Sequence, residues 1–171
     1  MALHDPPRES APEALRAFGS AGIRVVLVTG DGPETASAVA NAVGVPDDDG
    51  AVDLSRCADD ELDQVAGRSV LARATHEQRL AVAQIWKQQG HVVAMTGDGV
   101  NDGPALRRAD IGVAMGGRGT DVARQAADLV LADELATVVR AVDEGRRVYA
   151  NIRRFLLYGY LAARCAVSRG A

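Results

Sequence analysis

Hydrophobic and polar positions along the chain fall into two alternating patterns. Short apolar runs without polar interruption are typical of strands buried on both faces of a sheet, and apolar residues recurring every three or four positions are typical of amphipathic helices. The predicted strands lie at 23–29, 69–74, 92–95, 111–115 and 129–131, and the predicted helices at 11–21, 33–43, 59–66, 76–89, 102–108, 120–127 and from 134 onward. This repeated strand–helix order predicts an α/β fold with a doubly wound parallel sheet.

The run at 92–95 ends in an oxygen-rich loop. Its continuation reads Thr96-Gly97-Asp98-Gly99-Val100-Asn101-Asp102. Ligands of open α/β sheets bind at the carboxyl ends of strands, and Mg²⁺ prefers oxygen ligands and usually accompanies a phosphate. The side chains of Asp98, Asn101 and Asp102 are therefore candidate ligands. A solvated acidic turn after a core strand is the alternative.

A second strand ends in the same way. Residues 25–28 are apolar and lead into Thr29-Gly30-Asp31-Gly32. If the two strands lie near each other, their polar ends face one pocket. Two such ends favour a site for Mg²⁺ and phosphate over two unrelated turns.

Thr75 and Gln78 have the spacing of a capping box before the helix at 76–89.

The last predicted helix carries a basic cluster. Arg146, Arg147, Arg153 and Arg154 precede an apolar piece at 155–163. That piece is shorter than the ~20 apolar residues that a spanning helix needs. Two interpretations remain open: a long helix with basic ends, or a stalk that enters a membrane with the basic cluster on the cytoplasmic side.

Composition narrows the function classes. The chain has 171 residues, of which 47% are hydrophobic but only 4% aromatic, so a core of Val, Ala and Leu is expected. A net charge of −4 disfavours a general nucleic-acid binder. We expect a hinge segment at 1–10, a partial α/β domain at 11–133 and a long helix at 134–171, the start of a truncated membrane segment.

Several motifs together resemble the phosphorylation domain of cation-transporting P-type ATPases, which has a haloacid-dehalogenase-like fold. The most specific is T-G-D-G-V-N-D-G-P-A-L at 96–106, followed by A-D-I-G-V-A-M-G at 109–116. The other matching motifs, in order, are D-P-P-R at 5–8, V-T-G-D at 28–31, G-T-D-V-A at 119–123, A-D-L-V-L at 127–131 and E-G-R-R-V-Y-A-N-I-R at 144–153. The resemblance covers roughly residues 3 to 158.

The resemblance implies roles in phosphoryl transfer. Asp98 would be the direct protein ligand of Mg²⁺, and Asp102 would hold the Mg²⁺ shell and the nearby cation in place. Asn101 would hydrogen-bond the phosphoryl group, whose oxygens Thr29 and Gly30 would also bind. Such roles suit a reaction that depends on positioning and charge neutralisation.

Other residues take their implied roles from the same family. Asp31 belongs to the V-T-G-D catalytic motif, and Arg79 occupies the place of a lysine that neutralises charge around the phosphorylated carboxylate. Asp5 and Arg8 would form the hinge to a nucleotide-binding domain, so ATP would bind only in the complete pump. The complete protein would be membrane-associated through its C-terminal helix, with this domain on the cytoplasmic face, and the fragment by itself would be cytoplasmic.

One departure from the family decides the expected activity. The acceptor motif D-K-T-G-T does not occur in the 171 residues. We therefore expect a partial domain that binds Mg²⁺ and a phosphoryl group but is inactive alone, with the N-terminal half of the pump as its partner if that half exists as a separate chain. The alternative is a free-standing remnant that binds Mg²⁺ and phosphate, or docks on a partner, without turnover.

The missing motif also affects the expected sheet. In the family, the acceptor strand lies between the strands that end at Thr29 and Thr96. Without it these two strands would pair directly, leave a groove or recruit another segment. We expect the chain alone to be marginally stable and to expose apolar sheet surface.

Overall fold

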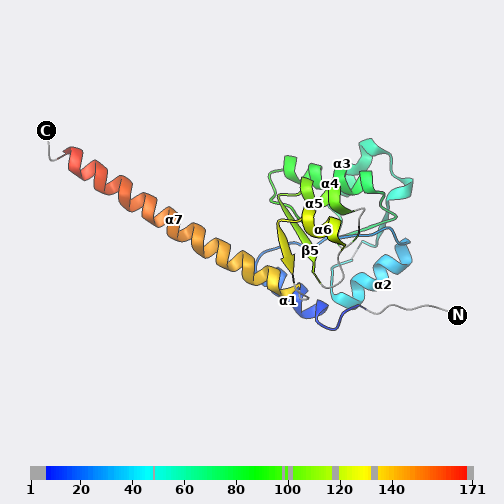
Figure 1. Ribbon diagram of the computed structural model, residues 1–171. Helices are drawn as coiled ribbons and strands as arrows, with labels where there is room; N and C mark the ends of the chain where they lie inside the picture. The colour runs from blue at the N-terminus through cyan, green and yellow to red at the C-terminus, as the bar shows by residue number, and fades with distance from the viewer. Residues whose placement is uncertain are drawn as a thin grey trace.

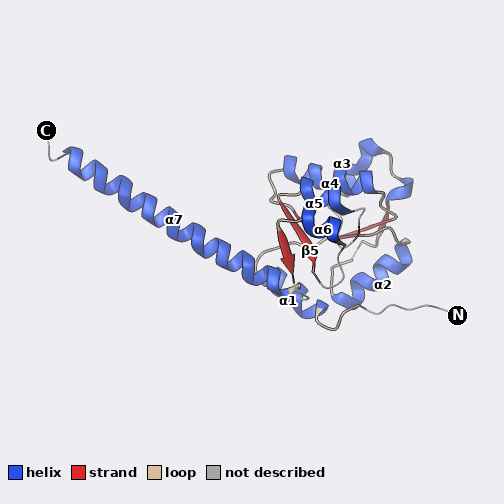
Figure 2. Ribbon diagram, in the orientation of Figure 1, coloured by secondary structure: helices blue, strands red, loops and turns tan. Residues whose placement is uncertain are grey.

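The computed structural model describes residues 7–47, 49–97, 99, 102–116, 120–131 and 135–168. Helices and strands alternate along most of this length (Figures 1 and 2). The strands are β1 (Leu27–Val28), β2 (Val52–Asp53), β3 (Val70–Ala72), β4 (Ala94–Gly97), β5 (Ile111–Met115) and β6 (Leu129–Leu131). The helices are α1 (Ala11–Ser20), α2 (Pro33–Val43), α3 (Leu62–Val65), α4 (His76–Gln88), α5 (Gly103–Arg108), α6 (Asp121–Ala126) and α7 (Ala136–Ser168), with 3-10 turns η1 (Leu54–Arg56) and η2 (Asp59–Glu61).

The strands form two parallel three-stranded sheets. The first sheet has the order β1-β3-β2 and the second has the order β4-β5-β6. Leu27 lies opposite Val70 in the first sheet, and Thr96 lies opposite Val113 in the second. The predicted α/β class with parallel strands is confirmed. Within the described residues β1 and β4 do not pair with each other, so each is an edge strand.

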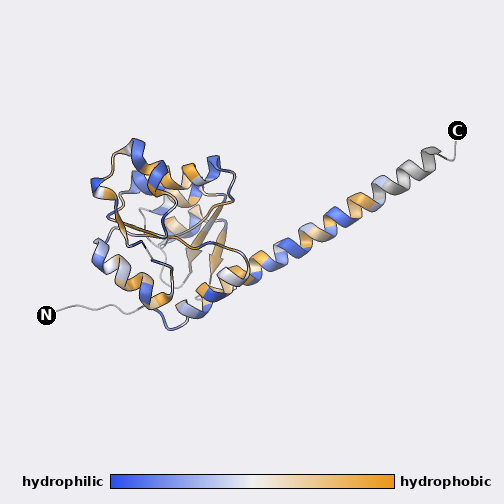
Figure 3. Ribbon diagram, turned by 180° about the vertical axis from the view of Figure 1, so that it is seen from behind, coloured by the Kyte–Doolittle hydropathy of each residue, from blue (hydrophilic) through white to orange (hydrophobic). Residues whose placement is uncertain are grey.

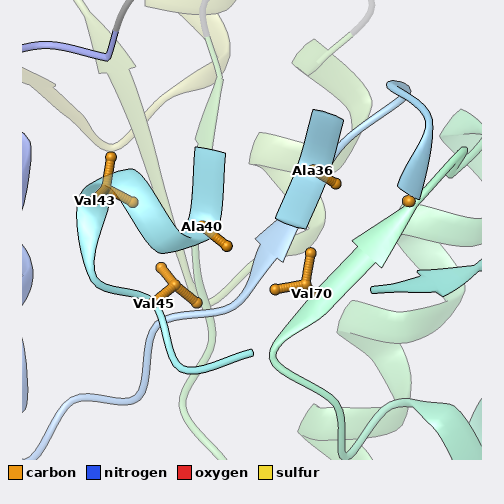
Figure 4. Packing of buried hydrophobic residues seen from close by; sticks show 6 residues of the cluster. Ala36, Ala40, Val43, Val45 and Val70 are labelled. Atoms are coloured by element: carbon orange, nitrogen blue, oxygen red, sulfur yellow. The ribbon is translucent and has the colours of Figure 1, made fainter. Parts of the chain in front are cut away.

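Helices cover both faces of the first sheet. Alternate residues of β3 point to opposite faces, as the pleat requires. Val70 packs with Ala36, Ala40 and Val43 of α2 (Figure 4). Leu71 instead joins the cluster under α3 and α4, whose members are Leu54, Leu62, Ala66, Leu71, Ala74 and Val82. All three residues of β3 are fully buried, so β3 is the central strand of this sheet in its packing as well as in its pairing.

The second sheet repeats this arrangement. Val113 of β5 packs with Phe18 of α1 and Val138 of α7 on one face. The neighbouring Ala114 packs with Leu106 of α5 and with α6 on the other face. Small side chains on these helices allow close approach to the sheet, which agrees with the core of Val, Ala and Leu that the composition predicts.

Three details differ from the sequence-based expectations. The expected strand at 23–29 is hydrogen-bonded as a strand only at Leu27–Val28, where β3 supplies a partner. The short strand β2 was not expected. The run at 92–95 is not fully buried: Val93 is 6% exposed but Val92 is 79% exposed. Val92 lies before β4, and β4 itself is an edge strand whose residues are exposed or only partly buried, whereas the sequence pattern predicts a strand buried on both faces.

Helix α7 leaves the α/β body. Its first turns pack beside α1, and its remainder extends away from both sheets (Figure 1). The Arg146 guanidinium donates a hydrogen bond of 2.6 Å to the carbonyl of Ala21, just after α1. In the part of the chain that the structure describes, no helix has the length and apolar character needed to cross a bilayer.

Candidate phosphoryl-binding site

The turn after β1 is held in a defined shape by its own side chains. The Thr29 hydroxyl donates to the Asp31 carboxylate at 3.0 Å and accepts from the Asp31 N–H at 3.1 Å. Two backbone bonds attach the turn to the end of β3: Arg73 N–H donates to Asp31 C=O at 2.8 Å, and Ala74 N–H donates to Thr29 C=O at 2.9 Å. The Thr29–Gly30–Asp31 turn is therefore fixed at the carboxyl end of the first sheet.

Helix α4 brings Arg79 to this turn. The predicted capping box is present: the Thr75 hydroxyl accepts from Gln78 N–H at 3.2 Å, and the Gln78 side chain accepts from Thr75 N–H at 3.1 Å. The Gln78 amide also donates to Leu54 C=O at 2.9 Å. Because the Gln78 side chain is hydrogen-bonded through both its oxygen and its nitrogen, the first turn of α4, including Arg79, has a fixed position.

Arg79 reaches the loop of the second sheet. Its Nη1 lies 3.1 Å from Asp102 Oδ1, and both side chains are about one-fifth exposed, at 21% and 20%. The other carboxylate oxygen of Asp102 accepts from Gly99 N–H at 3.1 Å. Asp102 thus positions Arg79 and also closes the loop that follows β4.

Arg79 also lies beside the turn of the first sheet. A Cβ built on Gly30 would be 3.7 Å from Arg79 Nη2. The arginine therefore lies beside the first T-G-D-G turn and is paired with Asp102, three positions after the second turn. Its Nε is buried and has no hydrogen-bond partner among the described residues. A buried N–H donor of a guanidinium without a partner suits an anionic ligand, because leaving it unpaired costs free energy.

Gly97 makes the approach of Asp102 possible. A Cβ at this position would lie 2.5 Å from Asp102 Cβ, which is far inside van der Waals contact. Glycine was expected here for its turn geometry and for ligand approach to the backbone. The structure adds a second reason, because the carboxylate that holds Arg79 occupies the space of a side chain.

Several candidate residues lie outside the described part of the chain. These are Asp5 of the hinge segment, Asp98 and Asn101. Arg8 is described, and its carbonyl accepts from Ala11 N–H at 3.0 Å at the start of α1. Among the described residues no three His, Cys, Asp or Glu side chains gather as a metal site. The predicted Mg²⁺ ligation by Asp98 and Asp102 therefore stays a prediction.

Arg73, whose N–H bonds to the turn after β1, is a residue that the sequence analysis did not identify. Its φ is +49°, the left-handed region that residues with a Cβ rarely adopt. Its Nε lies 3.7 Å from the Asp53 carboxylate, and both residues line a surface hollow of about 470 Å³. A hydrogen bond from the Ser55 hydroxyl, aided by Arg73 and Arg56, lowers the pKa of Asp53. No local sequence signal marks an arginine for positive φ.

An ion pair beside β4 fixes the second sheet against α4. Lys87 Nζ lies 3.0 Å from Asp110 Oδ1, and Asp110 Oδ2 accepts from Val93 N–H at 2.9 Å. The Val93 hydrogen bond and Lys87 lower the pKa of Asp110. This contact lies at the opposite end of β4 from Asp102, so α4 is attached near both ends of the strand.

The fold and these motifs agree with a known family model. Residues 1–110 match the model of the haloacid dehalogenase-like hydrolases. The chain belongs to the haloacid dehalogenase-like hydrolase family. Within that family its resemblance to the phosphorylation domain of cation-transporting P-type ATPases is confirmed by its relatives and by a solved structure.

The relatives are much longer proteins. The chain is 41% identical over 176 residues to Calcium-transporting ATPase 1 of Yarrowia lipolytica, covering 98% of this chain and 19% of that protein. It is 48% identical over 168 residues to the probable cation-transporting ATPase F of Mycobacterium bovis, covering 92% and 19%. A crystal structure of a zinc-transporting PIB-type ATPase in the E2·Pi state has a TM-score of 0.69 at 31% identity, covering 90% of this chain and 21% of that chain. This haloacid dehalogenase-like chain therefore spans about one-fifth of the length of these relatives.

Proposed function

We propose that this chain is the C-terminal part of the phosphorylation domain of an ATP-driven cation pump, and that it binds Mg²⁺ and a phosphoryl group without accepting the phosphoryl group itself. The observation that carries the proposal is the position of Arg79, between Gly30 and Asp102, with a buried Nε left for an anion. A phosphoryl group bound there would receive the Thr29 hydroxyl and the Gly30 N–H from one side and the guanidinium from the other.

The donor set suits Mg²⁺ as the accompanying ion. Asp98 follows Gly97 directly in the sequence and would supply a carboxylate near the carboxyl end of β4, where the phosphoryl group would lie. Bound Mg²⁺ would supply charge neutralisation of the phosphoryl oxygens. Asp102 is already held by Arg79 and Gly99, which suits a supporting role around the ion better than direct ligation.

The division into two sheets supports the proposal that the acceptor strand is missing from this chain. The edges of β1 and β4 have no strand partner among the described residues, and the resemblance implies that the acceptor strand lies between these two strands. In the complete pump that strand would carry the acceptor aspartate, ATP would come from the nucleotide-binding domain, and α7 would lead to the membrane. A separate N-terminal half, if one exists, would be the natural partner.

Two measurements test the proposal. The chain is incubated with Mg²⁺ and γ-labelled ATP and quenched in acid; we expect no acid-stable label, and label on the chain would contradict the missing acceptor. Titration calorimetry with inorganic phosphate should show binding that requires Mg²⁺. Arg79→Met should lower this affinity about tenfold or more, as removal of a charge-assisted contact does, while the matched variant Arg107→Met, exposed at the end of α5, should keep it.

A complementation experiment separates the alternative function. A free-standing remnant would bind Mg²⁺ and phosphate equally well but would not respond to the missing half. Addition of a polypeptide that carries both the D-K-T-G-T strand and the nucleotide-binding domain should give acid-stable labelling on that polypeptide if the pump proposal is correct. Phosphate binding without any such rescue would favour the remnant.

A further inference from the structure

The end of β3 departs from a regular parallel ladder. Thr29 N–H donates to Leu71 C=O at 2.9 Å, and a regular ladder would continue with Arg73 N–H on Thr29 C=O. Instead, Ala74 N–H donates to Thr29 C=O at 2.9 Å, and Arg73 N–H donates to Asp31 C=O at 2.8 Å. Arg73 is therefore one extra residue in the ladder, as in a β-bulge.

The left-handed backbone of Arg73 accounts for this pattern. Successive N–H groups of an extended strand point to opposite sides. The N–H groups of Arg73 and Ala74 both reach the turn after β1, so they point to the same side. Left-handed backbone brings neighbouring N–H groups together in this way. Among the described residues Arg73, at φ +49°, is the only non-glycine residue with positive φ. Its unusual conformation thus directs two N–H donors at two carbonyls of one turn.

The two held carbonyls set the direction of the groups that would bind phosphate. A peptide unit is planar and trans, so its C=O and N–H point in opposite directions. The Thr29 C=O points at Ala74, so the Gly30 N–H of the same peptide unit points away from β3. It is directed toward the edge of β1 that has no strand partner among the described residues. The backbone of Arg73 therefore determines where the Gly30 N–H is directed.

The Arg73 side chain is held from the other side by β2. The strands of the body are largely hydrophobic (Figure 3), and Arg73 is the first polar residue after the buried β3. Its Nε lies 3.7 Å from Oδ2 of Asp53, which ends β2 and lies opposite Ala72. The Asp53 carboxylate also accepts from the Ser55 hydroxyl at 2.6 Å. Because left-handed backbone is unfavourable for a residue with a Cβ, this ion pair helps to hold Arg73 in place.

We propose that Arg73 is a positioning residue for the phosphoryl-binding turn. It acts through the carbonyls of Thr29 and Asp31 rather than by touching the phosphoryl group, and Asp53 holds it from the neighbouring strand. The inference rests on the proposed function in one respect, namely that the turn binds phosphate. It adds that the affinity for phosphate depends on the backbone conformation at position 73, not on the charge there.

Two substitutions at position 73 separate backbone from charge. Both are compared with the parent by titration calorimetry with inorganic phosphate in the presence of Mg²⁺. Arg73→Gly removes the guanidinium but adopts positive φ freely, so the affinity should stay within about twofold of the parent. Arg73→Val removes the same guanidinium, but a β-branched residue resists this φ, so the affinity should fall about tenfold or more. Equal losses in the two variants would overturn the proposal.

Two control variants exclude charge and general instability. Arg56 Nε lies 3.5 Å from the same Asp53 carboxylate, and the φ of Arg56 is not positive. Arg56→Val should therefore bind phosphate as the parent does. Val138→Ala, at a buried position of α7, should lower the urea midpoint without changing the affinity. A loss of affinity in either control as large as that in Arg73→Val would overturn the proposal.

The part played by Asp53 is tested in two backgrounds. Asp53→Asn should lower the phosphate affinity of the parent about twofold, because the ion pair is partly exposed. In the Arg73→Gly background it should have no effect, since glycine needs no partner to keep its backbone. The same loss in both backgrounds would exclude the Asp53 pair as the support of Arg73.

Amide hydrogen exchange tests the geometry without phosphate. In the ligand-free chain the Ala74 N–H should be protected in the parent and in Arg73→Gly, and should exchange about tenfold faster in Arg73→Val than in Val138→Ala. Equal protection of this N–H in the glycine and valine variants would overturn the inference. If the parent binds no phosphate, the proposed function fails, and the exchange rates still decide whether residue 73 positions the turn.

Discussion

Arg79 and Asp102 form an ion pair of 3.1 Å that joins helix α4 to the loop after β4. The strands of the two sheets do not pair with each other in the described residues, and this contact links their carboxyl ends. It also places the guanidinium beside Gly30. A single pair thus supports both the junction between the sheets and the candidate site.

A double-mutant cycle measures this pair. Arg79→Met and Asp102→Asn should each lower the free energy of unfolding by about 1–3 kcal/mol, because each leaves a partly buried polar partner unsatisfied. The double variant should lose less than the sum, with a coupling energy of about 0.5–3 kcal/mol, measured by urea denaturation. Additive effects within about 0.5 kcal/mol would show that the two side chains do not interact.

Gly97 should not accept a side chain. Gly97→Ala places a Cβ 2.5 Å from Asp102 Cβ, so the start of α5 must shift. We expect a loss of about 1–3 kcal/mol in the free energy of unfolding, as for other overpacked sites. The control is Gly19→Ala in α1, where nothing lies within 4 Å of the added methyl group and a gain of about 0.5–1 kcal/mol is expected. Equal effects at both positions would argue against the close contact.

The cap of α4 should contribute to stability. Thr75→Ala removes the acceptor of Gln78 N–H and should cost about 0.5–2 kcal/mol. Thr75→Ser keeps a hydroxyl at the same place and should retain most of the stability. Thermal denaturation of the two variants provides the comparison, and an alanine variant as stable as the serine variant would exclude the cap as a source of stability.

Asp110 should make stability depend on acid pH. Its pKa in the folded chain is lowered from the ordinary 3.8 by the Val93 N–H and Lys87. A lowered pKa contributes stability that is complete above the ordinary value and is lost as pH falls through the folded value. Asp110→Asn should therefore be less stable than the parent at pH 7, and the difference should shrink below about pH 4. A difference in melting temperature that stays constant from pH 7 to pH 3 would contradict this.

The edges of β1 and β4, which have no strand partner among the described residues, should limit the stability of the chain alone. We expect a low urea midpoint that rises by roughly 1 M when a preceding segment with the D-K-T-G-T strand is fused to the chain. The same fusion with proline in the middle of that strand should give little gain, because proline cannot complete a central ladder. A cooperative transition of ordinary midpoint for the chain alone would contradict this expectation.

Local sequence determined many of the individual elements. The expected bounds of α2, β5 and β6 agree with the structure, and so does the capping box of Thr75 and Gln78. These features depend on neighbours within a few positions, such as Pro33 at the start of α2 and Gly44 after its end. Short-range patterns are sufficient for them because the physical cause is equally short-range.

The tertiary structure alone decided how these elements meet. The division into two sheets and the exposure of β4 depend on which strands find partners. The contact of Arg79 with Asp102 joins residues 23 positions apart. Periodicity shows which side of an element is apolar, but it contains no information about the neighbour that covers that side. The apolar pattern at 92–95 is that of a central strand, and only the arrangement of the sheets makes β4 an edge.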